Sequence, residues 1–202
     1  MDGTRVTIKS EGVYILSGTC DDGMVIVDAD KSAKIQIVCK NVTLHSQTSA
    51  AIYVKQADKV FLTLEAGTIS VTGCYEGLEA QVVNISGGEV DIVSSDDGVN
   101  AAGGNDSSSK ENSFGRRDMF DTDEDARVTI SGGVLRVSAE GDGLDSNGYL
   151  TVSGGEIYVT GPTNSGNGSL DYGIEAEISG GLFVAAGSSL TLSDSSGKDL
   201  FT

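Results

Sequence analysis

The sequence predicts a right-handed parallel β-helix, a solenoid whose coils take roughly 21–26 residues each. Three observations predict this fold: a Ser-Gly-Gly motif recurs at near-constant spacing, alternating apolar residues flank it, and glycine is abundant at 28 residues while proline occurs once. No segment shows a helical period, which removes a βαβ arrangement, and parallel crossovers are generally right-handed. A β-sandwich would not need the same corner in every repeat, although a repeat of hairpins of about this length stays open.

Two sequence elements define the repeat. Four segments align on Ser-Gly-Gly: VVNISGGEVDIV from Val82, RVTISGGVLRVS from Arg127, YLTVSGGEIYVT from Tyr149 and EAEISGGLFVAA from Glu175. The second element is acidic: EGLEA from Glu76, DGVNA from Asp97, DGLDS from Asp142 and YGIEA from Tyr172. One unit cannot bury its apolar side alone, so the units must stack into a continuous core.

Alternation with a period of two assigns side chains to the two faces of each strand. The residues expected inside are Val83, Ile85, Val90, Ile92, Val128, Ile130, Leu135, Val137, Leu150, Val152, Ile157 and Val159. Asp91, Arg136 and Tyr158 then form an outward column on a flat sheet face.

The chain reads as a single β-helix domain over residues 1–202. Its first half lacks Ser-Gly-Gly but has short strands at similar spacing, which indicates coils with different corners. A polar segment without periodicity, at about 103–126, separates two units that otherwise abut. We expect it to leave the coil as a loop, either a functional one or a tolerated insertion.

The net charge of −17 limits the classes of partner. Nucleic acid and anionic membranes would be repelled, whereas cations would be attracted. No apolar run reaches the length of a membrane span, and no signal peptide is recognisable at Met1. The three cysteines have neither a metal-binding spacing nor a redox motif.

Stacking would bring acidic residues of successive coils to about 4.8 Å from one another. One expected column contains Glu79, Asn100, Asp145 and Glu175, and its neighbour contains Glu76, Asp97 and Asp142, with Asp96 and Asp171 one residue earlier. Stacked like charges repel, so they require cations, protonation or exposure to water. Ca²⁺ suits such oxygen donors, and we expect the adjacent glycines to turn backbone carbonyls inward as further ligands.

Candidate sugar-binding residues are aromatic or basic side chains near the acidic loops and on the outward column. They are Tyr75, Tyr172, Tyr158, Arg136, Arg116 and Arg117. A tyrosine ring can stack on a sugar, although tyrosine is also simply favoured on sheet faces.

Four stretches also carry a family resemblance: GVYILSGTCDDGMVIVDA, AAIYVKQADKVFLTLEAGT, YEGLEAQVVNISGGEVDIVSSDDGVNAAGGND and GDGLDSNGYLTVSGGEIYVTGPTNSGNGSLDYG. Together they resemble the bacterial carbohydrate-binding domain-containing proteins, which are secreted, calcium-binding parallel β-helices often found with spore-coat-type kinase-like proteins. The resemblance implies a fold similar to pectate lyases, binding of cellulose or polygalacturonate, and a location outside the cell or at its surface. Family members usually have more coils where GTISVTG passes directly into CYEGLEA, so sites on those coils cannot be carried over.

Three functions remain open at this point. The first is calcium-dependent, non-catalytic binding of plant cell-wall polysaccharide, such as pectin or cellulose. The second is a polysaccharide lyase acting by β-elimination, for which Ca²⁺ would acidify the substrate and Arg136, Arg116, Arg117 or Lys110 would act as base. The spacing reveals no calcium cluster with a partnered base, so we assign no catalytic residue. The third is a calcium-stiffened surface or adhesion solenoid, whose exposed coil edges could pair with another protomer.

Overall fold

The computed structural model is all-β in the part of the chain that it describes, which comprises residues 4–46, 50–101, 122–162, 167–187, 192–193 and 199–201. These residues contain no helix, and therefore none with the length and hydropathy of a transmembrane span. The sequence excursion predicted at about 103–126 lies mostly outside the described residues, apart from its return at 122–126.

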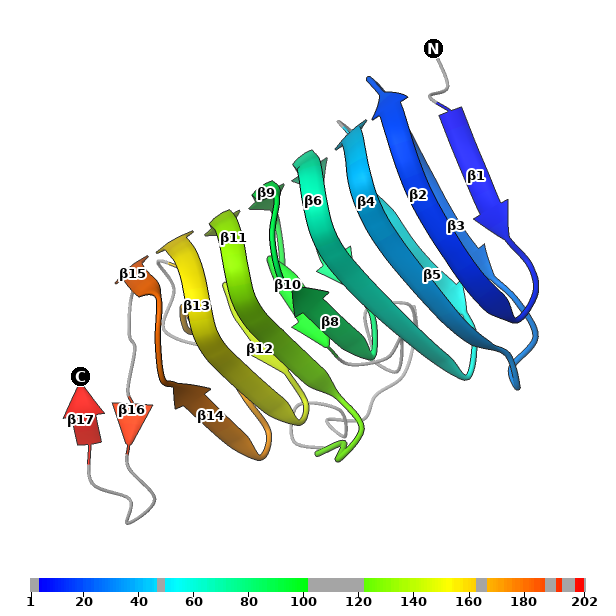
Figure 1. Ribbon diagram of the computed structural model, residues 1–202. Helices are drawn as coiled ribbons and strands as arrows, with labels where there is room; N and C mark the ends of the chain where they lie inside the picture. Colours follow the sequence, from blue (N-terminus) through cyan, green and yellow to red (C-terminus); the bar gives the residue numbers. More distant parts are fainter. Residues whose placement is uncertain are drawn as a thin grey trace.

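Two parallel sheets wind around a common interior (Figure 1). The six-stranded sheet contains β1 (Thr4–Ile8), β3 (Gly23–Asp28), β5 (Ile52–Gln56), β7 (Leu78–Glu79), β10 (Val99–Ala101) and β12 (Leu144–Ser146). The nine-stranded sheet contains β2 (Gly12–Cys20), β4 (Lys34–Ser46), β6 (Lys59–Cys74), β8 (Val82–Ile85), β9 (Glu89–Ser94), β11 (Arg127–Ala139), β13 (Tyr149–Thr160), β14 (Glu175–Ile178) and β15 (Leu182–Ala186). A short antiparallel pair, β16 (Leu192–Ser193) and β17 (Asp199–Phe201), follows at the C-terminal end.

The chain alternates between the two sheets, and each strand pairs with its equivalent in the next coil. Thus β4 pairs with β6, and β11 pairs with β13, both in parallel. Every pairing within the two large sheets is parallel, which rules out the hairpin repeat. The predicted parallel β-helix is therefore confirmed.

Apolar side chains from both sheets fill the interior. All twelve residues that alternation placed inside are buried, each with at most 3% of its surface exposed. Register aligns them into columns: Val90, Leu135 and Ile157 are partners in adjacent strands. The main stabilising contribution to such a fold is the burial of these β-branched and γ-branched side chains, which contact their equivalents in the next coil along the axis.

The Ser-Gly-Gly corners need glycine at both positions for different reasons. The second glycine has a left-handed backbone, with φ of 82° at Gly133 and 88° at Gly155, where a side chain would be strained. At the first glycine, a Cβ added to Gly132 or Gly154 would lie 2.5 Å from the carbonyl oxygen of a serine in the preceding coil. The motif thus permits both a sharp corner and close stacking of successive coils.

Candidate functional site

The acidic turns stack from coil to coil, largely as the sequence predicted. Asn100 pairs with Glu79 in β7 and with Asp145 in β12, which confirms these three as one column. The neighbouring column follows from the backbone, because the N–H of Gly77 donates to the carbonyl of Asp97, and that of Gly98 donates to the carbonyl of Asp142. The short strands β7, β10 and β12 therefore position these side chains.

Glu175 does not belong to this column, although the repeat alignment placed it there. It lies in β14 of the nine-stranded sheet, opposite Tyr149. Leu170 forms the bridge to Leu144, so Asp171 takes the place beside Asp145. The alignment was wrong because Leu170-Asp171 and Ile174-Glu175 present the same apolar-acid pair, and only the hydrogen bonds distinguish them.

Two carboxylates of the turns link adjacent coils. The backbone N–H of Asp142 donates to Oδ1 of Asp97 at 2.6 Å, and the N–H of Gly168 donates to Oδ1 of Asp142 at 2.5 Å. The carbonyls of Gly98 and Gly143 accept from the preceding coil, so they serve the ladder and do not turn inward as expected. Part of the acidic pattern is therefore a structural link between coils.

Burial makes ionisation of these carboxyls unfavourable. It raises the pKa of Asp97 from 3.8 to about 8, with a further contribution from the charge of Asp145. It raises the pKa of Asp142 to about 6, and the bond from Gly168 opposes this shift. At neutral pH, the turns consequently hold a proton at Asp97 or require a nearby cation.

Asn100 provides a polar atom without a partner in this setting. Its Nδ2 donates to Oε1 of Glu76 at 3.2 Å and to Oδ2 of Asp97 at 3.4 Å, which fixes the orientation of the amide. Only 3% of the residue is exposed, and its Oδ1 accepts no hydrogen bond. A buried amide oxygen, on a side chain whose nitrogen contacts two carboxylates, fits the donor preferences of Ca²⁺.

The side chains do not by themselves complete a calcium site. Across the described ranges, no three His, Cys, Asp or Glu side chains converge as a metal-binding group. Asp96 lies at the turn beside Asp97, where its backbone N–H donates to the carbonyl of Tyr75, and Asp171 accepts from the N–H of Tyr172.

A groove crosses the outer face of the nine-stranded sheet, over β6, β9, β11 and β13. It has a volume of about 270 Å³. The register of β9, β11 and β13 confirms the predicted outward column of Asp91, Arg136 and Tyr158. All three of these residues line the groove. A second row, also facing outward, contains Thr72, Val93, Ser138 and Thr160. The groove thus combines one aromatic ring, one guanidinium, a carboxylate and hydroxyl groups.

Arg136 is held between two carboxylates of the neighbouring strand. Its Nη1 donates to Oε1 of Glu89 at 2.5 Å and to Oδ1 of Asp91 at 3.1 Å. These bonds raise the pKa of Arg136 further above its ordinary value. Tyr158 donates its hydroxyl to Oε2 of Glu156 at 3.0 Å, and that bond raises the pKa of the phenol.

The other predicted sugar-binding residues lie elsewhere. Tyr75 is 56% exposed but follows the end of β6 outside the groove, and Tyr172 packs partly against the core. Arg116 and Arg117 lie outside the described residues. Glu89 and the row of hydroxyls were not predicted, although the same alternation that places Arg136 outward also directs Ser138 outward.

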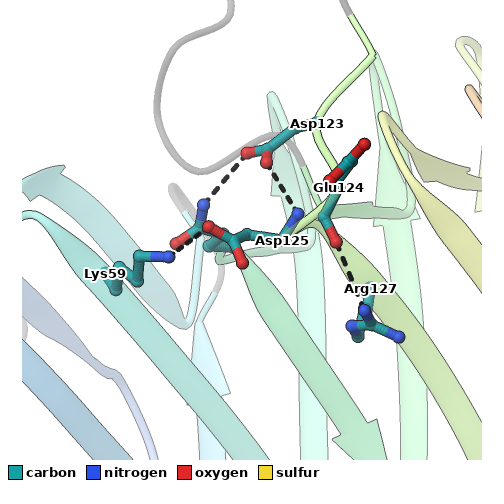
Figure 2. Close-up of polar contacts among 6 residues, drawn as sticks. Lys59, Asp123, Glu124, Asp125 and Arg127 are labelled. Atoms are coloured by element: carbon teal, nitrogen blue, oxygen red, sulfur yellow. Dashed lines mark hydrogen bonds and ion pairs between the residues drawn. The ribbon is translucent and has the colours of Figure 1, made fainter.

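A second polar cluster holds residues 122–126, the segment directly before β11, against the neighbouring coils (Figure 2). Asp123 accepts from the backbone N–H of Asp125 at 2.8 Å and from Nε2 of Gln81 at 3.0 Å, while Lys59 forms an ion pair with Asp125. Arg127 donates to the backbone carbonyl of Glu124 at 3.2 Å. These contacts join the segment before β11 to β6 and to the turn before β8, which indicates a structural role.

Comparison with known proteins finds sequence similarity in the N-terminal coils. The family model of carbohydrate-binding domain-containing proteins matches residues 2–71. The predicted resemblance is confirmed for these residues. A relative from Acetivibrio thermocellus with the same description is 37% identical over 67 residues, which are 33% of this chain and 23% of that protein. The match to the relative therefore spans about a quarter of that protein's length. The match to the family model ends at residue 71, before most of the groove and all of the acidic turns.

A solved structure can be superposed on most of this chain. It is described as the polysaccharide lyase-like protein from C. thermocellum, in a gadolinium derivative. The superposition covers 91% of this chain and 86% of that one, with 21% sequence identity and a TM-score of 0.48.

Proposed function

We propose that this chain binds an extended polysaccharide, without cleaving it, in the groove over β6, β9, β11 and β13. The observation that supports this most is the groove itself, in which the exposed Arg136 and the ring of Tyr158 lie beside outward hydroxyls. Sugar sites typically combine a stacking ring with planar polar groups. The match of residues 2–71 to carbohydrate-binding domain-containing proteins agrees with this function.

Cleavage by β-elimination would need a base that can accept a proton. Arg136 is the strand-borne basic residue of the groove, and its bonds to Glu89 and Asp91 keep the guanidinium protonated. Such a group can orient a ligand but cannot abstract a proton from it. The geometry of the described residues therefore favours binding over lyase chemistry.

We further propose that Ca²⁺ supports this function by binding at the acidic turns, through Asp97, Asn100 and Asp142. The unpartnered Oδ1 of Asn100 and the burial of both carboxylates support this assignment. A bound cation would offset the unfavourable ionisation of Asp97 and would stiffen the stack of coils. The polymer we propose is a plant cell-wall polysaccharide, met outside the cell or at its surface.

Titration calorimetry with soluble oligosaccharides tests the binding function. The wild type and Tyr158→Ala would be titrated with cellohexaose and with oligogalacturonate, in calcium and in chelator, while ultraviolet absorbance reports any unsaturated product. Tyr75→Ala serves as control, since Tyr75 is exposed outside the groove. Binding that Tyr158→Ala alone weakens supports the proposal. Absence of binding to both sugars, or accumulating unsaturated product, would overturn it.

A further inference from the structure

We propose that the groove selects neutral sugar chains and rejects uronate polymers. This inference rests on the proposed function and names the class of polysaccharide for the same site. It follows from the arrangement of charge around Arg136 and from the hydroxyl groups along the groove.

The outer face of β9, β11 and β13 carries three parallel rows of three side chains. Register places Glu89, Val134 and Glu156 in the first row, Asp91, Arg136 and Tyr158 in the second, and Val93, Ser138 and Thr160 in the third. Neighbours within a row belong to adjacent strands, about 4.8 Å apart. This surface therefore presents three carboxylates around a single guanidinium.

The positive charge of Arg136 is already compensated within the protein. Glu89 and Asp91 both accept its hydrogen bonds through the same Nη1, and their side chains are 46% and 42% exposed. A ligand carboxylate approaching Arg136 would meet these two acids first. Glu156 adds a third negative charge beside Tyr158, whose hydroxyl it accepts. The local balance is thus negative, in a chain whose net charge is −17.

A polymer of uronic acids carries one carboxylate on every residue, so several would face this surface at once. Repulsion would weaken such binding, most of all at low ionic strength, where screening is least. A neutral chain has no such disadvantage. Its hydroxyls can donate to Glu89, Asp91 and Glu156, and can exchange hydrogen bonds with Thr72, Ser138 and Thr160.

The apolar part of the groove agrees with this selection. Val93 is 49% exposed and lines the same groove as Tyr158, two strands away, so the floor contains carbon surface that can face the C–H side of a sugar ring. Specificity then comes from both attraction and repulsion, since the hydroxyls favour neutral rings and the acids disfavour charged ones.

The test compares cellohexaose and xylohexaose with hexagalacturonate by titration calorimetry at low and moderate salt, in chelator and in calcium. We expect the wild type to bind at least one neutral hexamer at least about tenfold more tightly than hexagalacturonate. The double variant Glu89→Gln/Asp91→Asn keeps the shape of the groove and frees the charge of Arg136. We expect it to bind hexagalacturonate about tenfold more tightly than the wild type does, with a gain that fades as salt increases.

The control is Asp21→Asn/Asp22→Asn, which makes the same change in net charge on an exposed turn after β2, outside the residues that line the groove. If it improves hexagalacturonate binding equally, the selection is not local and the inference fails. Equal or tighter binding of hexagalacturonate by the wild type, with or without calcium, also overturns the inference but leaves polysaccharide binding intact. Absence of binding to all three hexamers would instead overturn the proposed function. Circular dichroism confirms that the variants retain their fold.

Discussion

The backbone N–H of Asp142 donates a hydrogen bond of 2.6 Å to Oδ1 of Asp97, one coil earlier in the stack. The carboxylate of Asp142 repeats the arrangement by accepting from the N–H of Gly168. Each acid therefore binds the backbone of the next coil while lying near other acids. This explains how one sequence motif can stabilise the stack and also create a place where a cation is favourable.

Asp97→Asn should reduce the pH dependence of stability in the absence of calcium. The folded state raises the pKa of Asp97 from 3.8 to about 8, so the folded protein retains a proton that the unfolded chain releases. This group's contribution to stability is therefore fully present below about pH 4, is lost as pH rises, and levels off above about pH 8. The asparagine keeps the acceptor for the N–H of Asp142 but cannot ionise.

Denaturant unfolding in chelator at pH 5 and pH 8 measures the difference. Between these values, we expect the wild type to lose on the order of 2–4 kcal/mol more stability than Asp97→Asn does. Asp21→Asn, on an exposed turn, controls for the change in net charge. Parallel pH profiles for the wild type and Asp97→Asn would contradict the assigned shift.

Asp142→Ala should weaken both calcium binding and the fold. The substitution removes a proposed ligand and also the acceptor for the N–H of Gly168. Since Ca²⁺ binds only deprotonated carboxylates, we expect the wild-type affinity for calcium to rise with pH up to about pH 8 and the melting temperature to rise on calcium addition. Both calcium effects should diminish in the variant. A calcium titration identical to that of the wild type would remove Asp142 from the site.

The sequence was sufficient for the fold because its signals are local. Alternation and the Ser-Gly-Gly corners depend on neighbouring residues, so the interior positions of Val90, Leu135 and Ile157 could be read directly. Contacts between coils were harder to predict. The position of Glu175 depended on which of two similar apolar-acid pairs aligns with Leu144-Asp145, and the hydrogen bonds decided for Asp171.

The groove shows the same limit of sequence reasoning. Asp91, Arg136 and Tyr158 could be predicted as a column because they occupy equivalent positions in the repeat. The bond between Arg136 and Glu89 is diagonal: the two residues lie on adjacent strands, and Glu89 is two residues before Asp91, the register partner of Arg136. A repeat alignment gives the register of such a pair but not the conformations that bring the two side chains together.

Gly154→Ala should destabilise the protein because the corner has no room for a methyl group. A Cβ at this position would lie 2.5 Å from the carbonyl oxygen of Ser131, which is backbone and cannot move away independently. We expect a loss of about 1–3 kcal/mol, as for other overpacked sites. Thermal or denaturant unfolding measures it, with Ser153→Ala at the exposed preceding position as control. Equal stability of the two variants would show that the coils can separate to admit the methyl group.

Asp123→Ala should weaken the attachment of residues 122–126 to the neighbouring coil and lower the stability of the protein. Its carboxylate accepts from Nε2 of Gln81, a residue that is only 8% exposed, and from the N–H of Asp125. Leaving the buried amide without a partner should cost about 1–3 kcal/mol. Glu124→Ala is the matched control, since Glu124 contributes its backbone carbonyl to Arg127 and its side chain is exposed. Unfolding curves that shift equally in both variants would refute the anchoring role.

Tyr158 offers the sharpest separation between stacking and hydrogen bonding in the groove. Its hydroxyl already donates to Glu156, which leaves the ring face as the part that a sugar would contact. We therefore expect Tyr158→Phe to bind the neutral hexamers within about threefold of the wild type, and Tyr158→Ala to bind them about tenfold more weakly. Calorimetry with cellohexaose and xylohexaose measures both. If the phenylalanine variant loses as much affinity as the alanine variant, the hydroxyl and its bond to Glu156 position the ligand, and stacking on the ring is not the main contribution.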